Sequence, residues 1–176
     1  MKKMMAVAMA AALAAPAFAG DFYVGADLGR SSIKGGSDYV NGVKVSVADG
    51  NGTAVNLYGG YKLNETVSFE AGYRTLGSVT ASALGANVDV KANALQISAV
   101  AFLPVSSDFS VFGRVGVNRV SLEASYKGVS NTDHTTKALV GFGGRYAINK
   151  EVGLRAEYQK QAADVSSLTV GVDYQF

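Results

Sequence analysis

Apolar and polar residues alternate one by one along most of this chain. In the segment that begins at Phe22, the apolar side chains fall on one parity as far as Leu28, and Asp27 lies on the other parity among glycines. Because successive side chains of a β-strand point to opposite faces, this period of two predicts a strand with one apolar face. Eight segments show the pattern, at residues 22–29, 55–63, 67–74, 95–103, 110–118, 140–148, 152–159 and 168–176. None has a sustained helical period, so we predict an all-β fold.

The connections between these segments alternate in length. Each segment is close to the roughly 9–11 residues that a tilted strand needs to cross a bilayer. Tight turns are expected at 64–65, 104–108 and 149–150, long loops at 31–52, 77–88 and 121–135, and a medium connection at 160–165. Short turns at one end and long loops at the other are typical of outer-membrane barrels. We therefore predict an eight-stranded antiparallel up-and-down transmembrane β-barrel with both termini at the short-turn end.

The alternation alone does not decide which face points outward. A soluble barrel of the lipocalin type would have its apolar face inside. Tyr and Phe residues near the segment ends favour a membrane barrel, because aromatic rings prefer the bilayer interface. Charges on the polar face also favour it, because a narrow lumen can pair them and hydrocarbon cannot accommodate them. These expected lumenal charges are Asp27, Lys62, Glu70, Arg74, Arg114, Arg145, Arg155, Glu157 and Asp173.

The first residues have the features of an export signal. Lys2 and Lys3 precede an apolar run at 4–13, and Ala17-Phe18-Ala19 fits a small-x-small cleavage box. The run is shorter than the roughly 20 residues of a membrane-spanning helix. We predict a signal peptide at 1–19 and a single barrel domain at 20–176, exported to the bacterial outer membrane.

Composition excludes some functions. The chain has no cysteine, so disulfides do not stabilise it. Without Lys2 and Lys3, the 16 Lys and Arg residues fall to 14 and equal the 14 Asp and Glu residues. A nucleic-acid-binding protein would be expected to carry a basic patch, and none is visible in the sequence.

Candidate catalytic and metal-binding residues are few. His134 is the only histidine, and Ser130 and Asp133 lie beside it in the sequence. A catalytic triad is a spatial arrangement, so this proximity is better read as a solvated loop histidine. Asp38 and Asp49 show no metal-ligand spacing. We predict no catalytic, cofactor or metal site.

Three strand segments carry a family resemblance. Gly-Gly-Tyr-Lys-Leu-Asn at 59–64, Phe-Glu-Ala-Gly-Tyr-Arg at 69–74 and Leu-Arg-Ala-Glu-Tyr-Gln at 154–159 resemble the strand repeats of OmpA-like transmembrane barrels. That family includes small neisserial surface proteins and opacity-type porin-family proteins. The terminal Tyr174-Gln175-Phe176 resembles the aromatic signal that the barrel-assembly machinery reads in such proteins. The chain ends at the barrel, so the wall-anchoring role of the peptidoglycan-binding domain of full-length OmpA is not expected here.

The resemblance also bears on the lumenal charges. In relatives, interior carboxylate–guanidinium pairs obstruct the barrel, and their exchange gates conduction. The best matches here are Glu70, Arg74, Arg114, Arg155 and Glu157, within a network that also includes Arg145 and Asp173. A satisfied network of this kind can equally be structural and hold the strand register.

Two functions remain open at this stage. The first is a non-enzymatic structural and surface-interaction (adhesin-like) protein, whose outer loops contact host surface molecules. Its other expected partners are outer-membrane lipid, lipopolysaccharide and, through the C-terminal strand, the barrel-assembly machinery. The alternative is a narrow porin-like pore for small solutes or ions.

Overall fold

The computed structural model describes residues 22–34, 36–40, 43–47, 49–83, 86–126, 129–162 and 165–176, so the predicted signal peptide lies outside it. Its strands are β1 (Phe22–Ile33), β2 (Gly36–Val40), β3 (Val43–Val47), β4 (Gly50–Lys62), β5 (Val67–Ala83), β6 (Ala86–Pro104), β7 (Phe109–Tyr126), β8 (Val129–Ala147), β9 (Val152–Ala162) and β10 (Val165–Gln175). Within the described residues, no helix has the length and hydropathy needed to span a bilayer.

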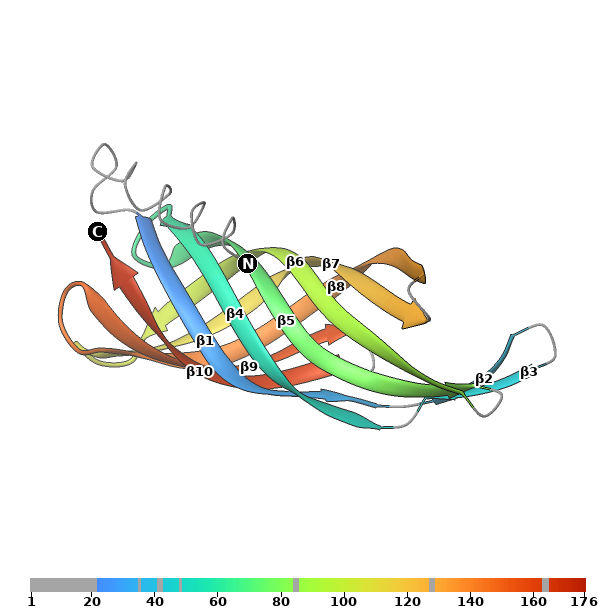
Figure 1. Ribbon diagram of the computed structural model, residues 1–176. Helices are drawn as coiled ribbons and strands as arrows, with labels where there is room; N and C mark the ends of the chain where they lie inside the picture. The colour runs from blue at the N-terminus through green and yellow to red at the C-terminus, as the bar shows by residue number, and fades with distance from the viewer. Residues whose placement is uncertain are drawn as a thin grey trace.

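The strands β1 and β4 to β10 form a closed antiparallel barrel, as the sequence predicts (Figure 1). The first and last strands close it, because β1 pairs with β10 from Tyr23 opposite Gln175 to Ile33 opposite Val165. The N–H of Phe176 donates to the carbonyl of Phe22 at 3.1 Å, which places the first strand's start and the C-terminus at the same end. A closed barrel pairs its backbone groups internally, which hydrocarbon requires.

The three short turns repeat one hydrogen-bonding scheme. In the first, the side-chain oxygen of Asn64 accepts from the N–H groups of Thr66 and Val67, at 2.9 and 2.8 Å. Asn149 caps the turn between β8 and β9 in the same way, and Ser106 accepts from the N–H of Phe109 between β6 and β7. Asn and Ser stabilise such turns because their short side chains bond the backbone locally. The predicted tight turns are therefore confirmed.

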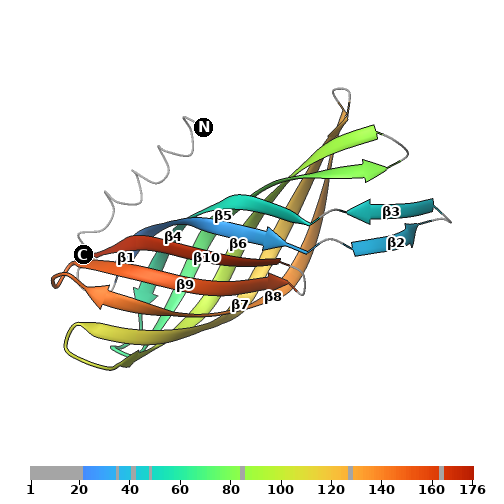
Figure 2. The same cartoon turned by 90° about the horizontal axis from the view of Figure 1, so that it is seen from below.

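The prediction of long loops is wrong, because most of the residues assigned to them are in strands. The ladder between β5 and β6 continues to Ala83 opposite Ala86, and that between β7 and β8 to Tyr126 opposite Val129. The first connection contains the β2–β3 hairpin, and β3 also pairs with β5. Outside the bilayer both faces of a strand contact water, so the alternation ends while the backbone pairing continues. The hairpins project from the end of the barrel opposite the C-terminus (Figures 1 and 2).

The apolar face of each strand points outward. Phe69, Val115 and Val170 are 51%, 62% and 62% exposed on the outer wall, whereas Arg114 and Glu157 are each 1% exposed inside. Aromatic side chains also line the outer wall near the ends of the alternating segments, among them Phe22, Tyr61, Tyr73, Phe109, Tyr146, Tyr158 and Tyr174. This is the arrangement of a membrane barrel and not of a soluble carrier.

A polar network inside the barrel

A carboxylate on β5 is the centre of the barrel interior. Glu70, which is 2% exposed, accepts a hydrogen bond from Arg114 Nη2 at 2.5 Å and one from Arg155 Nη1 at 2.8 Å. The hydroxyl of Tyr23 also donates to Glu70, at 2.7 Å, and lies 2.8 Å from the hydroxyl of Ser68. These donors come from β7, β9 and β1, so one carboxylate joins four strands.

A second carboxylate completes this layer. Glu157 on β9 accepts from Arg114 Nε at 2.7 Å and Nη2 at 3.2 Å, and Arg155 Nη2 lies 3.6 Å from its Oε2. Arg114 Nη1 donates to the hydroxyl of Ser98 at 2.6 Å. Two guanidinium groups and two carboxylates therefore balance each other in charge. We call Glu70, Arg114, Arg155 and Glu157 the ion layer.

Two aromatic rings hold one member of the ion layer in place. The guanidinium carbon of Arg155 lies 4.2 Å from the ring centroid of Phe112 and 5.1 Å from that of Tyr58. A cation in contact with an aromatic face is stabilised electrostatically, more so away from water. Both rings are buried, so they also fill the lumen around the charge.

Glycines make room for the tyrosines in the lumen. Tyr23 is paired across the β1–β4 ladder with Gly60, and Tyr58 with Gly25. A Cβ atom built on Gly60 would overlap the Tyr23 ring, and one built on Gly25 would overlap the Tyr58 ring. Each ring thus covers a glycine of the neighbouring strand, which explains why glycines occur on the polar face of these strands.

A chain of amide side chains crosses the lumen near the ion layer. Gln159 donates to Gln96 at 3.2 Å, Gln96 donates to Asn56 at 3.3 Å, and Asn56 donates to Asp27 at 2.9 Å. These residues come from β9, β6, β4 and β1, and each is 3% exposed or less. The first two of these bonds link strands that are not neighbours in the sheet, and the third joins the adjacent strands β4 and β1.

Arg74 is buried without a carboxylate partner in the described part of the chain. Its Nη1 donates to the hydroxyl of Ser167 at 2.6 Å, and Gln161 also donates to that hydroxyl. The Nε and Nη2 atoms of Arg74 have no protein partner, and neither has Asp27 Oδ1 nor Gln161 Oε1. Buried polar groups of this kind are commonly satisfied by internal water.

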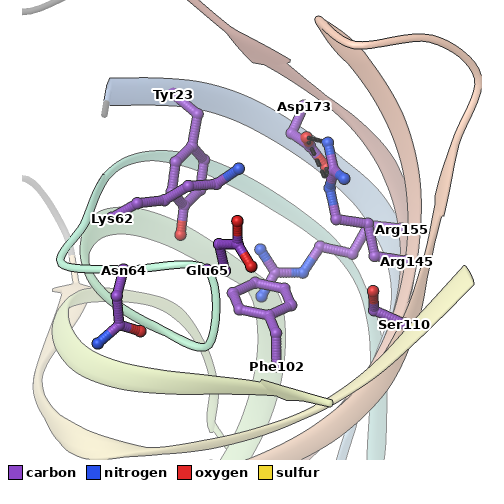
Figure 3. A pocket seen from close by; sticks show the side chains of 9 residues that line it. All are labelled: Tyr23, Lys62, Asn64, Glu65, Phe102, Ser110, Arg145, Arg155 and Asp173. Carbon is purple, nitrogen blue, oxygen red and sulfur yellow. Dashed lines mark hydrogen bonds and ion pairs between the residues drawn. The ribbon is translucent and has the colours of Figure 1, made fainter. Parts of the chain in front are cut away.

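A small cavity of about 140 Å³ opens at the short-turn end of the lumen. Arg145 and Asp173 form a bidentate ion pair on one wall, with nitrogen–oxygen distances from 2.5 to 3.0 Å. Asn64 and Glu65 line the cavity from the β4–β5 turn, and Figure 3 shows them across the cavity from that pair. Lys62, also on the lining, donates to the side-chain oxygen of Gln175. Arg155 of the ion layer reaches the same cavity.

The network obstructs the lumen and ties opposite walls together. Charges removed from water are stable only when they are paired and hydrogen-bonded, and removing one partner typically costs about 3–5 kcal/mol. Each charge of the ion layer has an opposite charge within 3.6 Å and a side chain no more than 1% exposed, whereas Arg155 Nε and Nη2 make no hydrogen bond within the protein. Among the described residues, no three His, Cys, Asp or Glu side chains gather as metal ligands would.

His134 lies on the outer part of β8 and not in a loop. Its Nδ1 is 2.9 Å from the hydroxyl of Ser121, the residue opposite it on β7, and both side chains are outside the lumen. Ser130 and Asp133, the residues weighed beside it in the sequence, have side chains outside the described set. Backbone N–H groups around the pair belong to a continuous strand ladder, so none is arranged as an oxyanion hole.

The structure places all the lumenal residues named from the sequence inside the barrel, but they do not form one connected cluster. It joins Glu70, Arg114, Arg155 and Glu157 in the ion layer, pairs Arg145 with Asp173 at the mouth, and leaves Arg74 apart. Sequence reasoning missed the aromatic contributors Tyr23, Tyr58 and Phe112. A usable signal existed, because all three lie on the polar parity of their strands. Val100 and Phe102, which interrupt the polar face of β6, also point inward.

Comparison with known proteins gives one consistent result. The sequence profile of the OmpA-like transmembrane domain matches residues 17–176. Outer membrane protein A of Salmonella typhi is 32% identical over 142 residues, covering 72% of this chain and 41% of its own length. Outer membrane protein A of Serratia marcescens is 29% identical over 202 residues, covering 99% of this chain and 56% of its own length. The chain thus spans about half the length of the curated relatives it matches.

Solved structures share the fold at low sequence identity. Neisserial surface protein A superposes with a TM-score of 0.67 at 19% identity, covering 88% of this chain and 97% of its own. OprG of Pseudomonas aeruginosa gives 0.65 at 14% identity, with coverages of 90% and 96%. Ail of Yersinia pestis, solved with the heparin analogue sucrose octasulfate, gives 0.57 at 17%, with coverages of 89% and 99%. All three are β-barrels of the outer membrane.

Proposed function

Because the chain belongs to the OmpA-like transmembrane domain family and is an outer-membrane β-barrel, we propose that it has a non-enzymatic, structural and surface-interaction (adhesin-like) role. The observation that carries this proposal is the ion layer. It fills the lumen with paired charges at mid-barrel, so the molecule is built as a closed cylinder. What remains available for function is its outer wall and its projecting hairpins.

The projecting hairpins support a surface role. The ladders β5–β6 and β7–β8 extend beyond the lipid-facing bands of their strands, and β3 ties the β2–β3 hairpin to β5. Binding segments held on a rigid scaffold are a common arrangement in proteins. Ail, a barrel of similar fold, was solved with a heparin analogue, which makes sulfated glycans a reasonable first probe.

The test is adhesion of bacteria that express the barrel to heparin-coated beads. Replacing residues 36–47 by a short Gly-Ser linker removes β2 and β3 and leaves the eight barrel strands intact. We expect at least a tenfold loss of adhered cells, with the folded barrel still migrating faster than the boiled one on a gel. Replacing Ser106 and Ser107 by glycines at the opposite end is the control. Equal adhesion of the deletion and the control would contradict the role of this hairpin.

A second candidate function is a narrow pore, favoured by one observation. Most of the buried side chains in the lumen are polar. Several buried atoms around Arg74 lack protein partners, so water can occupy that part. The ion layer with Phe112 and Tyr58 then forms the main barrier. If the barrel is closed, as the structural role requires, the wild-type protein should give no conductance steps in a planar bilayer. Phe112→Ala should give conductance steps, because it removes part of this barrier. Phe142→Ala, on the outer wall, is the control. Steps from the wild type would favour the pore.

Export and assembly complete the proposal. Residues 1–19 are proposed to be cleaved during export, which the intact mass of the purified outer-membrane form tests. A mass that includes these residues would contradict cleavage. Tyr174 and Phe176 are proposed to be read by the barrel-assembly machinery, because Tyr174 is exposed on the last strand and its ring contacts that of Phe176 at 5.2 Å.

A further inference from the structure

Two basic side chains occupy the outer wall just beyond its apolar band. Arg30 on β1 and Lys160 on β9 are exposed and share the outward parity of Leu28 and Tyr158, which precede them. Both strands run from the short-turn end toward the projecting hairpins. Arg30 and Lys160 therefore lie where the wall leaves the hydrocarbon on the outer side of the membrane.

One strand separates the two cations. Arg30 is opposite Leu168 on β10, and Lys160 is opposite Ser166 on the same strand. With neighbouring strands about 4.8 Å apart, the two backbones lie about 10 Å from each other across the sheet. The long side chains of Arg and Lys can both reach a group bound above β10.

The cross-strand neighbours of the pair carry no charge, and hydroxyl side chains lie among them beside apolar ones. The other cross-strand neighbours are Thr53 beside Arg30 and Val140 beside Lys160, and Ser32 lies opposite Ser166. Asp49, the nearest described carboxylate along this face, lies higher up, next to Gly50 at the level of Ile33. Hydroxyl groups and two cations form a set of donors suited to phosphate.

Beside Arg30 and below both cations, the same three strands offer an apolar face. Leu28 is 57% exposed, Leu168 is 61% exposed, and Val170 on β10 is 62% exposed. The Tyr158 ring packs on that of Phe142 at 5.6 Å and marks the bilayer interface. A ligand with acyl chains below and a phosphate above matches this surface in both parts.

The opposite end of the barrel has the reverse charge. The three short turns carry Glu65, Asp108 and Glu151 against a single Lys150. The cationic pair is therefore a feature of the outer end of the barrel, where the exposed Arg119 and Lys137 also lie. We propose that Arg30 and Lys160, with Ser32 and Ser166, bind the phosphoryl headgroup of a phosphorylated glycolipid of the outer leaflet. Its acyl chains lie on Leu28, Leu168 and Val170. This inference rests on the outer-membrane location and is independent of the adhesin-like role.

The experiment measures binding of diphosphorylated lipid A to the purified full-length barrel in detergent, by native mass spectrometry. Each basic residue near an anionic membrane surface strengthens binding by about fivefold, so Arg30→Gln with Lys160→Gln should weaken it by about 25-fold. Dephosphorylated lipid A should bind the wild type as weakly as lipid A binds this variant. All four side chains changed in the test and its control are exposed, so heat-modifiable gel mobility should be retained.

The control removes the same charge from the same end of the barrel. Arg119 on β7 and Lys137 on β8 are exposed, and Arg119→Gln with Lys137→Gln should change the affinity by less than threefold. An equal loss of lipid A affinity in both double variants would show a diffuse electrostatic attraction and no specific site, which would contradict the proposal. Undiminished binding by the Arg30/Lys160 variant, or equal binding of dephosphorylated lipid A, would overturn the proposal. None of these outcomes affects the adhesion assay, so the two proposals can fail separately.

Discussion

Glu70 and Arg155 bond directly across the barrel interior, with Oε1 and Nη1 2.8 Å apart, although 85 residues separate them in the sequence. Their strands, β5 and β9, are four strands apart in either direction around the barrel. This single contact therefore joins opposite walls. It is possible only because eight strands make a cylinder narrow enough for two side chains to meet.

Replacing Glu70 by Gln should destabilise the barrel by about 3–5 kcal/mol, because two buried guanidinium groups lose a shared countercharge. Urea unfolding in lipid vesicles, followed by gel mobility without boiling, measures the change. Glu65→Gln, on an exposed turn, removes the same charge and should leave the unfolding midpoint nearly unchanged. Equal midpoints for the two variants would show that the ion layer does not stabilise the fold.

Replacing Gly60 by Ala should cost about 1–3 kcal/mol, as overpacking of a filled interior typically does. The new Cβ would overlap the Tyr23 ring and displace its hydroxyl from Glu70. Gly113→Ala is the matched control, because a Cβ there meets nothing within 4 Å. The same unfolding assay applies, and a Gly60 variant as stable as the Gly113 variant would mean that the ring does not need the glycine.

Substitutions at Val115 and Val105 distinguish a side chain exposed to lipid from one exposed to water. Both are 62% exposed, but Val115 lies mid-strand on the outer wall and Val105 lies in a short turn. Val115→Arg should destabilise the barrel in a bilayer by about 2–4 kcal/mol, because the charge enters hydrocarbon. Val105→Arg should have little effect. Similar unfolding midpoints for both variants in lipid vesicles would contradict the assignment of the outer wall to the membrane.

Replacing Phe176 by Ser should lower the amount of folded barrel in the outer membrane of cells and leave refolding of the purified chain in detergent unchanged. The reason is that the proposed assembly signal acts on a cellular machine and not on the final fold. Phe109→Ser removes an aromatic ring, 39% exposed, from the same end and serves as the control. Gel mobility of membrane fractions measures folded protein. Equal losses in cells for both variants would argue against a signal at Phe176.

The sequence determined the local features of this protein. The alternation around Phe22 and Leu28 predicted the first strand and its apolar face, because strand periodicity depends only on backbone geometry. Asn64 and Asn149 predicted tight turns for an equally local reason, since each side chain bonds the backbone two and three residues ahead. The parity of Glu70 and Arg114 indicated which side chains face inward.

Only the tertiary structure decided which inward residues meet. Strand count and stagger set Arg155 against Glu70 and left Arg74 with Ser167, and neither quantity can be read from spacing along the chain. The hairpins beyond the membrane also escaped sequence reasoning, since a strand that contacts water on both faces has no reason to alternate. The alternation of apolar and polar residues exists only where one face of a strand contacts lipid and the other faces the lumen. Contacts across the lumen and pairing beyond the bilayer depend on the closed barrel, and so they appear only when the whole chain is folded.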